Sequence, residues 1–188
     1  MIDTTAYYVV DNFKGTDPVI RKIARFPEYG FQNYDLLIRQ VYTIDKNKDK
    51  FYYTNKKSDR LYSYSFITHT SYIFPIPGTH NISYSKNLKN STMDEERKYK
   101  MQNDINFSLF ADTRENLYLI RKKPSPENNR KYEVLGFSKS GDLIDSLTIQ
   151  SNHFNVPLAF IYKDQIYIPN GADHTYFVVS LQLPDDKS

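Results

Sequence analysis

The most regular part of the chain is residues 105–149, where four short apolar runs alternate with polar turns. The runs cover residues 107–111, 117–121, 131–137 and 142–149. Short apolar runs joined by polar turns are typical of an antiparallel meander, and four of them make up about one blade of a β-propeller. The pattern therefore predicts a four-stranded antiparallel sheet in this region.

A similar pattern occupies residues 34–76. A strand is predicted over residues 36–44, where both faces are partly apolar, as in a sheet packed between neighbours. Residues 51–54 follow a charged turn, and in residues 61–66 the aromatic side chains alternate with serine, which gives a clean period of two. Residues 71–76 supply a fourth candidate strand before prolines end it. A second four-stranded sheet is therefore expected.

The C-terminal part predicts a third, incomplete unit over residues 156–183. Residues 156–162 and 165–168 flank the two-residue tip Lys163-Asp164, as in a tight hairpin. A turn at residues 170–173 leads into a last predicted strand over residues 174–183, and no fourth strand is left for this unit. Near the N-terminus, residues 6–10 and 19–26 are weaker strand candidates.

Residues 79–104 differ from the rest because apolar residues become rare and charges crowd together. Thr92 followed three residues later by Glu95 has the form of a capping box, which predicts a short charged helix over residues 93–101. We interpret this segment as a charged excursion between two sheets that lies on the solvated surface.

Three copies of an aromatic hairpin thus recur along the chain, and one hairpin cannot bury its own apolar faces. We therefore predict an all-β protein of antiparallel four-stranded meanders that form part of a β-propeller, with residues 1–188 as a single partial propeller domain. Its blade-like units are residues 34–76, 105–149 and 156–183. A β-sandwich is the alternative. An incomplete ring leaves edge strands near residues 36–44 or 174–183, through which a homo-oligomer could form.

The composition of the chain argues against several classes of function. The 25 basic and 22 acidic residues are interspersed without a long basic stripe, so we expect no nucleic-acid partner. The absence of cysteine excludes disulfides, thiol nucleophiles and thiolate metal sites. The longest apolar run, residues 156–162, is too short for a transmembrane segment, and the first five residues lack the features of a signal peptide.

The sequence shows no constellation of catalytic, cofactor-binding or metal-ligating residues. The four histidines are scattered, and the Asp173-His174 pair falls in a turn, where Asp forms local hydrogen bonds. There is no Gly-x-Ser-x-Gly elbow and no glycine loop that could hold a phosphate. Carboxylates at residues 94–96 fit a solvated helix start, and Asp142 and Asp145 are predicted to point to opposite faces of a strand. We therefore predict no site residues and no cofactor, and favour a protein that is not an enzyme. The histidines are His69, His80, His153 and His174.

The 17 tyrosines have two interpretations. Their rings suit packing within and between sheets, with the hydroxyl reaching water or backbone. Alternatively, some of them form a ligand surface on the loops at one end of the propeller, where aromatic rings stack on glycans or peptides.

Several segments together resemble a known family. They are FYYTNKKSDRLYSYSF, SYIFP, SLFADTRENLYLIRKK, YEVLGFSKSGDLIDSLTI and FIYKDQIYI. They resemble an uncharacterised family of six-bladed β-propeller lipoproteins of Bacteroidetes-type bacteria, similar in architecture to TolB-like and NHL-like propellers. The chain has about half the length expected for that family and lacks a cysteine that could carry a lipid. It therefore corresponds to the C-terminal half of a longer propeller or to a shortened relative.

The resemblance implies a non-catalytic binding or scaffold module at the cell envelope, in the periplasm or on the outer surface. Its partner would be a protein or a glycan. The alternative is a carbohydrate-active hydrolase of the propeller type, which requires two carboxylates that converge in one pocket. The resemblance carries no catalytic residue over to this chain.

Overall fold

The computed structural model describes residues 5–11, 19–25, 40–45, 49–80, 92–126 and 128–181, and these form four antiparallel sheets and a short helix. The predicted all-β class is therefore confirmed. The two-stranded sheet contains β1 (Thr5–Asp11) and β2 (Val19–Arg25). The next contains β3 (Gln40–Ile44), β4 (Lys50–Asn55), β5 (Arg60–Ser65) and β6 (Ser71–Pro75). The third contains β7 (Ile105–Ala111), β8 (Leu117–Lys122), β9 (Lys131–Phe137) and β10 (Leu143–Gln150). The last contains β11 (Phe160–Tyr162), β12 (Gln165–Asn170) and β13 (Thr175–Val179).

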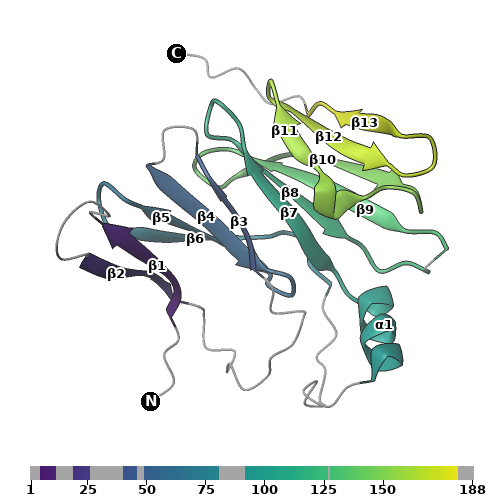
Figure 1. The fold of residues 1–188 in the computed structure, drawn as a ribbon, viewed down its shortest axis with the longest axis horizontal. Helices are drawn as coiled ribbons and strands as arrows, with labels where there is room; N and C mark the ends of the chain where they lie inside the picture. The colour runs from purple at the N-terminus through teal and green to yellow at the C-terminus, as the bar shows by residue number, and fades with distance from the viewer. Residues whose placement is uncertain are drawn as a thin grey trace.

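In each of the three larger sheets, the strands follow one another in chain order as a meander. These sheets are arranged in series along the molecule, with β7–β10 between the other two (Figure 1). Their first strands lie close together, since β3 and β11 both contact β7. Each of the three predicted units thus forms an antiparallel sheet of its own.

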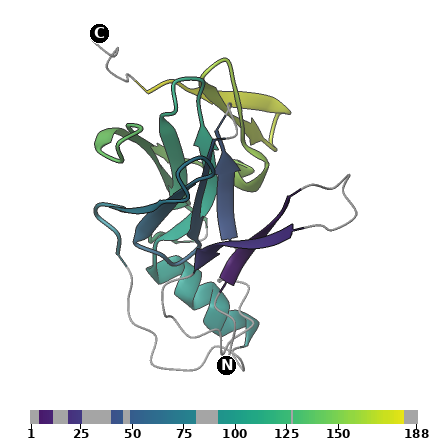
Figure 2. The same cartoon turned by 90° about the vertical axis from the view of Figure 1, so that its left-hand side faces the viewer.

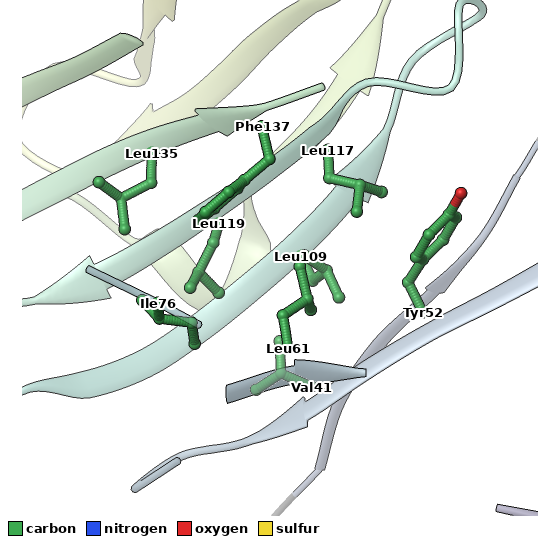
Figure 3. Packing of buried hydrophobic residues seen from close by; sticks show 9 residues of the cluster. All are labelled: Val41, Tyr52, Leu61, Ile76, Leu109, Leu117, Leu119, Leu135 and Phe137. Carbon is green, nitrogen blue, oxygen red and sulfur yellow. The ribbon is translucent and has the colours of Figure 1, made fainter. Parts of the chain in front are cut away.

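The first hydrophobic core lies between the β3–β6 sheet and the β7–β10 sheet. Leucines at three opposed positions, Leu109, Leu119 and Leu135, form a row across β7, β8 and β9 on this face. Side chains of β3 and β5 meet them from the other sheet (Figure 3). Each fully buried leucine contributes about 1.5–3 kcal/mol relative to an exposed one, so this interface fixes how the two sheets pack. The buried members of the cluster are Val41, Tyr52, Leu61, Ile76, Leu109, Leu117, Leu119, Leu135 and Phe137.

The second core lies on the opposite face of the same β7–β10 sheet, against β11–β13. Successive side chains of a strand point to opposite faces, and β8 is apolar on both. Leu117 and Leu119 enter the first core, whereas Tyr118 and Ile120 enter the second. Every residue of β8 is buried. The middle sheet is therefore covered on both sides. The second core contains Tyr118, Ile120, Tyr132, Val134, Ile149, Val156, Ile166, Ile168 and Val179.

A β-bulge in β7 changes the alternation there. The pairing between β7 and β8 shifts between Asn106 and Ser108, which leaves Phe107 as the extra residue. Phe107 packs against the second core, and the adjacent Ser108 Oγ donates to the Val156 carbonyl at 3.0 Å, toward the same side. The Asn106 amide instead reaches the β4–β5 turn, where it donates to the Asn55 carbonyl at 2.9 Å. The bulge thus lets β7 contact both neighbouring sheets.

The charged excursion contains the predicted short helix, which buries one aromatic side chain. Helix α1 (Met93–Gln102) begins with the predicted capping box between Thr92 and Glu95. Tyr99 on this helix is buried against Ile105. Lys122 Nζ donates to the Lys100 carbonyl near the helix C-terminus at 2.7 Å. Most of the described side chains of residues 92–102 are exposed, as expected for a charged surface segment, while Tyr99 anchors the helix. Residues 81–91 lie outside the described residues. Figure 2 shows the helix below the sheets.

Two strand predictions in the C-terminal unit need correction. Val156–Leu158 forms a 3-10 turn, because Pro157 cannot donate to a sheet ladder, and the strand begins only at Phe160. The last strand covers Thr175–Val179 instead of residues 174–183, and His174 has a left-handed φ of 58° in the preceding turn. Residues 36–39 and 182–183 of the predicted strands lie outside the described residues.

The helices in the described part of the chain are too short and too polar to cross a membrane.

Candidate functional site

A pocket lies where the end of β3 meets the β7–β8 turn and the β11–β12 turn. It has a volume of about 240 Å³. We call it the three-turn pocket. The end of β3, the β7–β8 turn and the β11–β12 turn all contribute to it, so segments more than a hundred residues apart in sequence form one site. Its lining residues are Ile44, Ala111, Asp112, Thr113, Ile161, Tyr162, Lys163 and Asp164.

Asp112 organises the β7–β8 turn from inside. Its Oδ1 accepts hydrogen bonds from the backbone N–H groups of Arg114 and Asn116, each at 2.8 Å. Its Oδ2 accepts from Asn116 Nδ2 and from the Tyr118 hydroxyl, each at 3.0 Å. Burial, together with the negative charge of Asp112, raises the pKa of Tyr118 above its usual range. A carboxylate offers about four lone-pair sites, so Asp112 is saturated within its own turn.

Asp164 connects the β11–β12 turn to the β7–β8 turn. Its two carboxylate oxygens accept from the Thr113 backbone N–H at 2.9 Å and from Thr113 Oγ1 at 2.7 Å. Lys163 and Asp164 both have positive φ, 49° and 59°, as a two-residue hairpin of type I′ requires. The predicted tight tip is thus confirmed, and it presents the Asp164 carboxylate to the neighbouring sheet.

The β3–β4 hairpin fixes the β7–β8 turn from the other side. Asp45 Oδ1 accepts from the backbone N–H groups of Asp49 and Lys50 at 2.7 and 3.1 Å. Lys50 Nζ then forms a salt bridge with Glu115 Oε2 at 2.6 Å. Since Glu115 belongs to the β7–β8 turn, polar contacts from both neighbouring sheets fix that turn. Hydrogen bonds and a salt bridge therefore fix the walls of the three-turn pocket without a ligand.

The groups that this pocket offers to solvent are mainly apolar and aromatic. Ile44 is 48% exposed and Tyr162 is 56% exposed. Lys163 Nζ lies 5.4 Å from the centroid of the Tyr162 ring, a cation–π distance. The arrangement suits contact with an apolar or ring-shaped group, with an ammonium beside it for a hydrogen-bond acceptor. Asp112 and Asp164 face the pocket with oxygens that already accept hydrogen bonds.

None of the four histidines lines the three-turn pocket. His69 Nδ1 lies 3.0 Å from the Tyr64 hydroxyl, and the His80 backbone N–H donates to Asp104. His153 and His174 lie in turns, where their backbone groups bond to Gly171 and Asn170 respectively. Within the described residues, no three His, Asp or Glu side chains gather in a way that could hold a metal ion.

Three of the carboxylates considered in the sequence form local hydrogen bonds. Asp173 accepts from the Thr175 hydroxyl and backbone N–H at 2.6 and 3.1 Å, and these bonds lower its pKa. This is the local turn bonding that the sequence predicts. Glu95 completes the capping box of α1. Asp142 accepts from Ser140 Oγ at 2.7 Å in the turn before β10.

A separate buried ion cluster surrounds Arg121. Its Nε donates to Glu133 Oε2 at 2.6 Å, its Nη2 to the Pro77 carbonyl at 2.7 Å and its Nη1 to Thr79 Oγ1 at 3.1 Å. Lys123 adds a salt bridge to Asp104 at 3.0 Å. Each nitrogen of the guanidinium donates a hydrogen bond, so this cluster fastens the segment after β6 to the middle sheet.

The sequence did not single out the residues of the three-turn pocket, although their turns were predicted. A common signal exists: the first hairpin turn of each repeat unit contains an aspartate, Asp45, Asp112 or Asp164. Equivalent turns of repeated units lie at the same end when the units pack side by side. Aligning the three units on these turns would have indicated the pocket.

The fold and the pocket define an all-β protein of serially packed meander sheets with a site at their common turn end. No family model matches the sequence, and no curated protein matches it. A solved structure with a similar fold is a member of the DUF4221 family from Bacteroides vulgatus ATCC 8482. It has a TM-score of 0.61 and 12% sequence identity, over 85% of this chain and 50% of that chain.

At this identity the likeness concerns the fold alone. The neighbour belongs to an uncharacterised family of Bacteroidetes, as the sequence resemblance predicts, while the propeller architecture and the lipoprotein character stay predictions. The chain spans about half the length of the solved structure that it matches.

Proposed function

We propose that this chain is a non-catalytic binding or scaffold module of propeller type at the cell envelope, and that it holds its ligand in the three-turn pocket. One observation carries the proposal: hydrogen bonds fix the polar groups of the pocket walls, while Tyr162 and Ile44 stay open to solvent. Binding sites are commonly largely preformed and mostly apolar, with a few polar groups for orientation.

The arrangement of the strands supports the propeller interpretation. Each larger sheet is a meander, each packs face to face on the next, and the first strands β3, β7 and β11 lie adjacent. Radial repetition of such sheets builds a propeller around an axis lined by the first strands. The three-turn pocket then lies at one mouth of that axis, where loops of several blades meet.

A glycan or a peptide segment is the ligand class that fits best. The Tyr162 ring offers a surface for a sugar ring or an apolar side chain, and Lys163 lies next to it for a carboxylate, carbonyl or hydroxyl oxygen. The location at the cell envelope rests on the resemblance to the lipoprotein family.

A glycan array and a pull-down from envelope extracts of a Bacteroides species test this proposal. We expect a partner in one of the two assays, and we expect Tyr162→Ala to lose it. Tyr72→Ala is the matched control, because Tyr72 is 59% exposed but lies on β6, away from the pocket lining. Binding that survives Tyr162→Ala, or no binding in either assay, would count against the proposal.

A carbohydrate-active hydrolase is the second candidate, because two carboxylates, Asp112 and Asp164, line the same pocket. Against it, both carboxylates accept hydrogen bonds within and between turns, and these bonds tie them to the structure of the turns. Release of reducing sugar from envelope polysaccharides tests this. Activity that Asp164→Asn abolishes and Thr113→Val retains would replace the binding proposal, since Thr113→Val removes a hydrogen bond to Asp164 but keeps the carboxylate.

A further inference from the structure

The three-turn pocket is small, and its apolar wall is mostly aliphatic. Ile44, Ala111 and Ile161 line it, each from a different sheet, and Tyr162 is the aromatic residue among the described residues of the lining. Its volume of about 240 Å³ lies below the range of about 300–1,000 Å³ that is usual for small-molecule sites. The pocket therefore has room for one side chain or one sugar ring, and not for a longer part of either polymer.

The chemistry of the wall distinguishes a sugar from an apolar side chain. Each hydroxyl of a sugar needs a hydrogen-bond partner when it leaves water, and a hydroxyl buried against aliphatic carbon has none. Asp112 has no lone pair left for such hydroxyls, because it receives four hydrogen bonds within its own turn. A side chain such as leucine is instead stabilised by the same wall, because both lose apolar surface to water. The wall therefore favours an aliphatic side chain, as a peptide carries.

Lys163 supplies a hydrogen-bond donor beside this wall. Its Nζ lies 5.4 Å from the centroid of the Tyr162 ring, and within the described part of the chain it donates to no carboxylate or carbonyl oxygen. An ammonium carries three N–H donors. An acceptor oxygen on a ligand in the pocket would therefore meet a donor whose hydrogen bonds are unused.

The charges around the pocket select against a charged ligand. A ligand carboxylate that reached Lys163 would also lie near the carboxylates of Asp112 and Asp164. A ligand ammonium would lie near Lys163, while Asp164 already accepts two hydrogen bonds from Thr113. Like charges placed side by side at an interface are unfavourable by several kcal/mol, whereas a neutral carbonyl accepts from Lys163 without that cost. The two ends of a peptide are charged, so an internal segment fits best.

We propose that the three-turn pocket binds an internal, uncharged peptide segment through one aliphatic side chain, with Lys163 Nζ donating to a backbone carbonyl of that segment. The inference rests on the proposed binding function and narrows its ligand from a glycan or a peptide to a peptide alone. The aliphatic wall provides the affinity, and the surrounding charges provide the preference for neutral segments.

Methyl NMR on the full chain, labelled with ¹³C at the isoleucine δ1 positions, tests the proposal. The methyl groups of Ile44 and Ile161 report on the pocket, and Ile73, which is 56% exposed on β6 and outside the pocket lining, is the control. The loss of one signal in Ile44→Val, Ile161→Val or Ile73→Val assigns each methyl group. The probes are N-acetyl-leucine amide, which is neutral, N-acetyl-leucine, which carries a carboxylate, leucine amide, which carries an ammonium, and methyl β-glucoside.

We expect N-acetyl-leucine amide to shift the signals of Ile44 and Ile161 and to leave Ile73 unchanged. Each of the two charged leucine probes should need a concentration at least ~10-fold higher for half-saturation. Methyl β-glucoside should shift neither pocket signal in the same concentration range.

Lys163→Gln separates the role of the charge from a role in folding. Without the ammonium, the probe with a carboxylate should bind more weakly, and the probe with an ammonium should bind more tightly. A merely structural change would move both affinities in the same direction. Lys139→Gln, at an exposed position in the β9–β10 turn, makes the same change in net charge and should alter neither affinity.

The outcomes separate this inference from the proposed binding function. Shifts with methyl β-glucoside but not with N-acetyl-leucine amide overturn the inference and leave a binding pocket. Equal affinities for the three leucine probes overturn the charge argument, and a shift of Ile73 as large as those of Ile44 and Ile161 shows adsorption elsewhere and also overturns it. If no probe shifts Ile44 or Ile161, the inference fails, while a partner that Tyr162→Ala loses in the pull-down would still support the proposed function.

Discussion

Replacing Asp112 with alanine tests how the β7–β8 turn is held together. The substitution removes one acceptor group that receives two backbone N–H bonds, one amide bond and the Tyr118 hydroxyl bond. The Tyr118 hydroxyl is buried, so leaving it without a partner costs about 1–3 kcal/mol, and each remaining lost hydrogen bond costs about 0.5–1.5 kcal/mol. Water can reach part of the turn and recover some of this loss. We expect Asp112→Ala to lower the free energy of unfolding by about 3–4 kcal/mol.

Tyr118→Phe isolates one of these interactions. It removes the hydroxyl and keeps the ring in the second core, so we expect a loss of about 1 kcal/mol. In the double variant Asp112→Ala/Tyr118→Phe, the loss in free energy of unfolding should be smaller than the sum of the two single losses. The reason is that Tyr118→Phe has already removed the hydroxyl that Asp112→Ala would leave without a partner. Urea unfolding followed by far-UV circular dichroism measures all three variants, and an unchanged slope with urea concentration shows that the comparison is valid.

Two results would refute this reasoning. If Asp112→Ala costs less than about 1 kcal/mol, the carboxylate is not the centre of the turn. If the effects of Asp112→Ala and Tyr118→Phe are additive, the bond between the two side chains contributes nothing to stability. A useful companion is Asp112→Asn, which keeps the shape but turns an amide toward the donors, and which should therefore still destabilise the protein.

Three further predictions concern the packing between sheets. Gly141→Ala should destabilise the protein by at least ~2 kcal/mol in thermal unfolding, because φ is +92° and an added Cβ would lie 1.9 Å from the Phe74 ring; a neutral effect would contradict this contact. Burial raises the pKa of Tyr53 from 10.0 to about 12, so between these two pH values the folded state keeps a proton that the unfolded state loses. The free energy of unfolding should be unaffected below pH 10 and should fall by up to about 2–3 kcal/mol between pH 10 and 12. Tyr53→Phe should flatten this part of the pH profile in urea titrations. Asn106→Leu should cost about 2 kcal/mol in the same assay, because the Asn55 and Ser58 carbonyls lose their 2.9 Å donor, and a cost below ~0.5 kcal/mol would mean that water replaces it.

Local patterns predicted most strands because their causes are local. The apolar run at residues 131–137 coincides with β9, and the capping box at Thr92 starts α1. The bulge at Phe107 could not be predicted, because an extra residue in one strand appears only when its partner strand is known. The burial of Tyr99 was missed for a similar reason, since a charged helix shows no apolar stripe and one aromatic ring anchors it.

The three-turn pocket could not be predicted from local patterns because its position depends on how the sheets pack. Ile44, Asp112 and Asp164 come together only when both hydrophobic cores fix the three sheets side by side. The sequence predicted all three turns, but a turn aspartate has the same local signature wherever it lies. What distinguishes Asp164 is its bond to Thr113 in the neighbouring sheet, which is a tertiary contact.

Strand β8 has apolar side chains on both faces, so its pairing register decides which side chains enter each core. Inserting or deleting a single residue before Leu117 would exchange Leu117 and Leu119 with Tyr118 and Ile120, so leucine would meet a site shaped for tyrosine and the Tyr118 hydroxyl would be forced among leucines. Natural length variation should therefore gather in the tip at residues 124–130 and be absent from this strand. Any sequence that aligns with this one can be checked for that distribution of gaps.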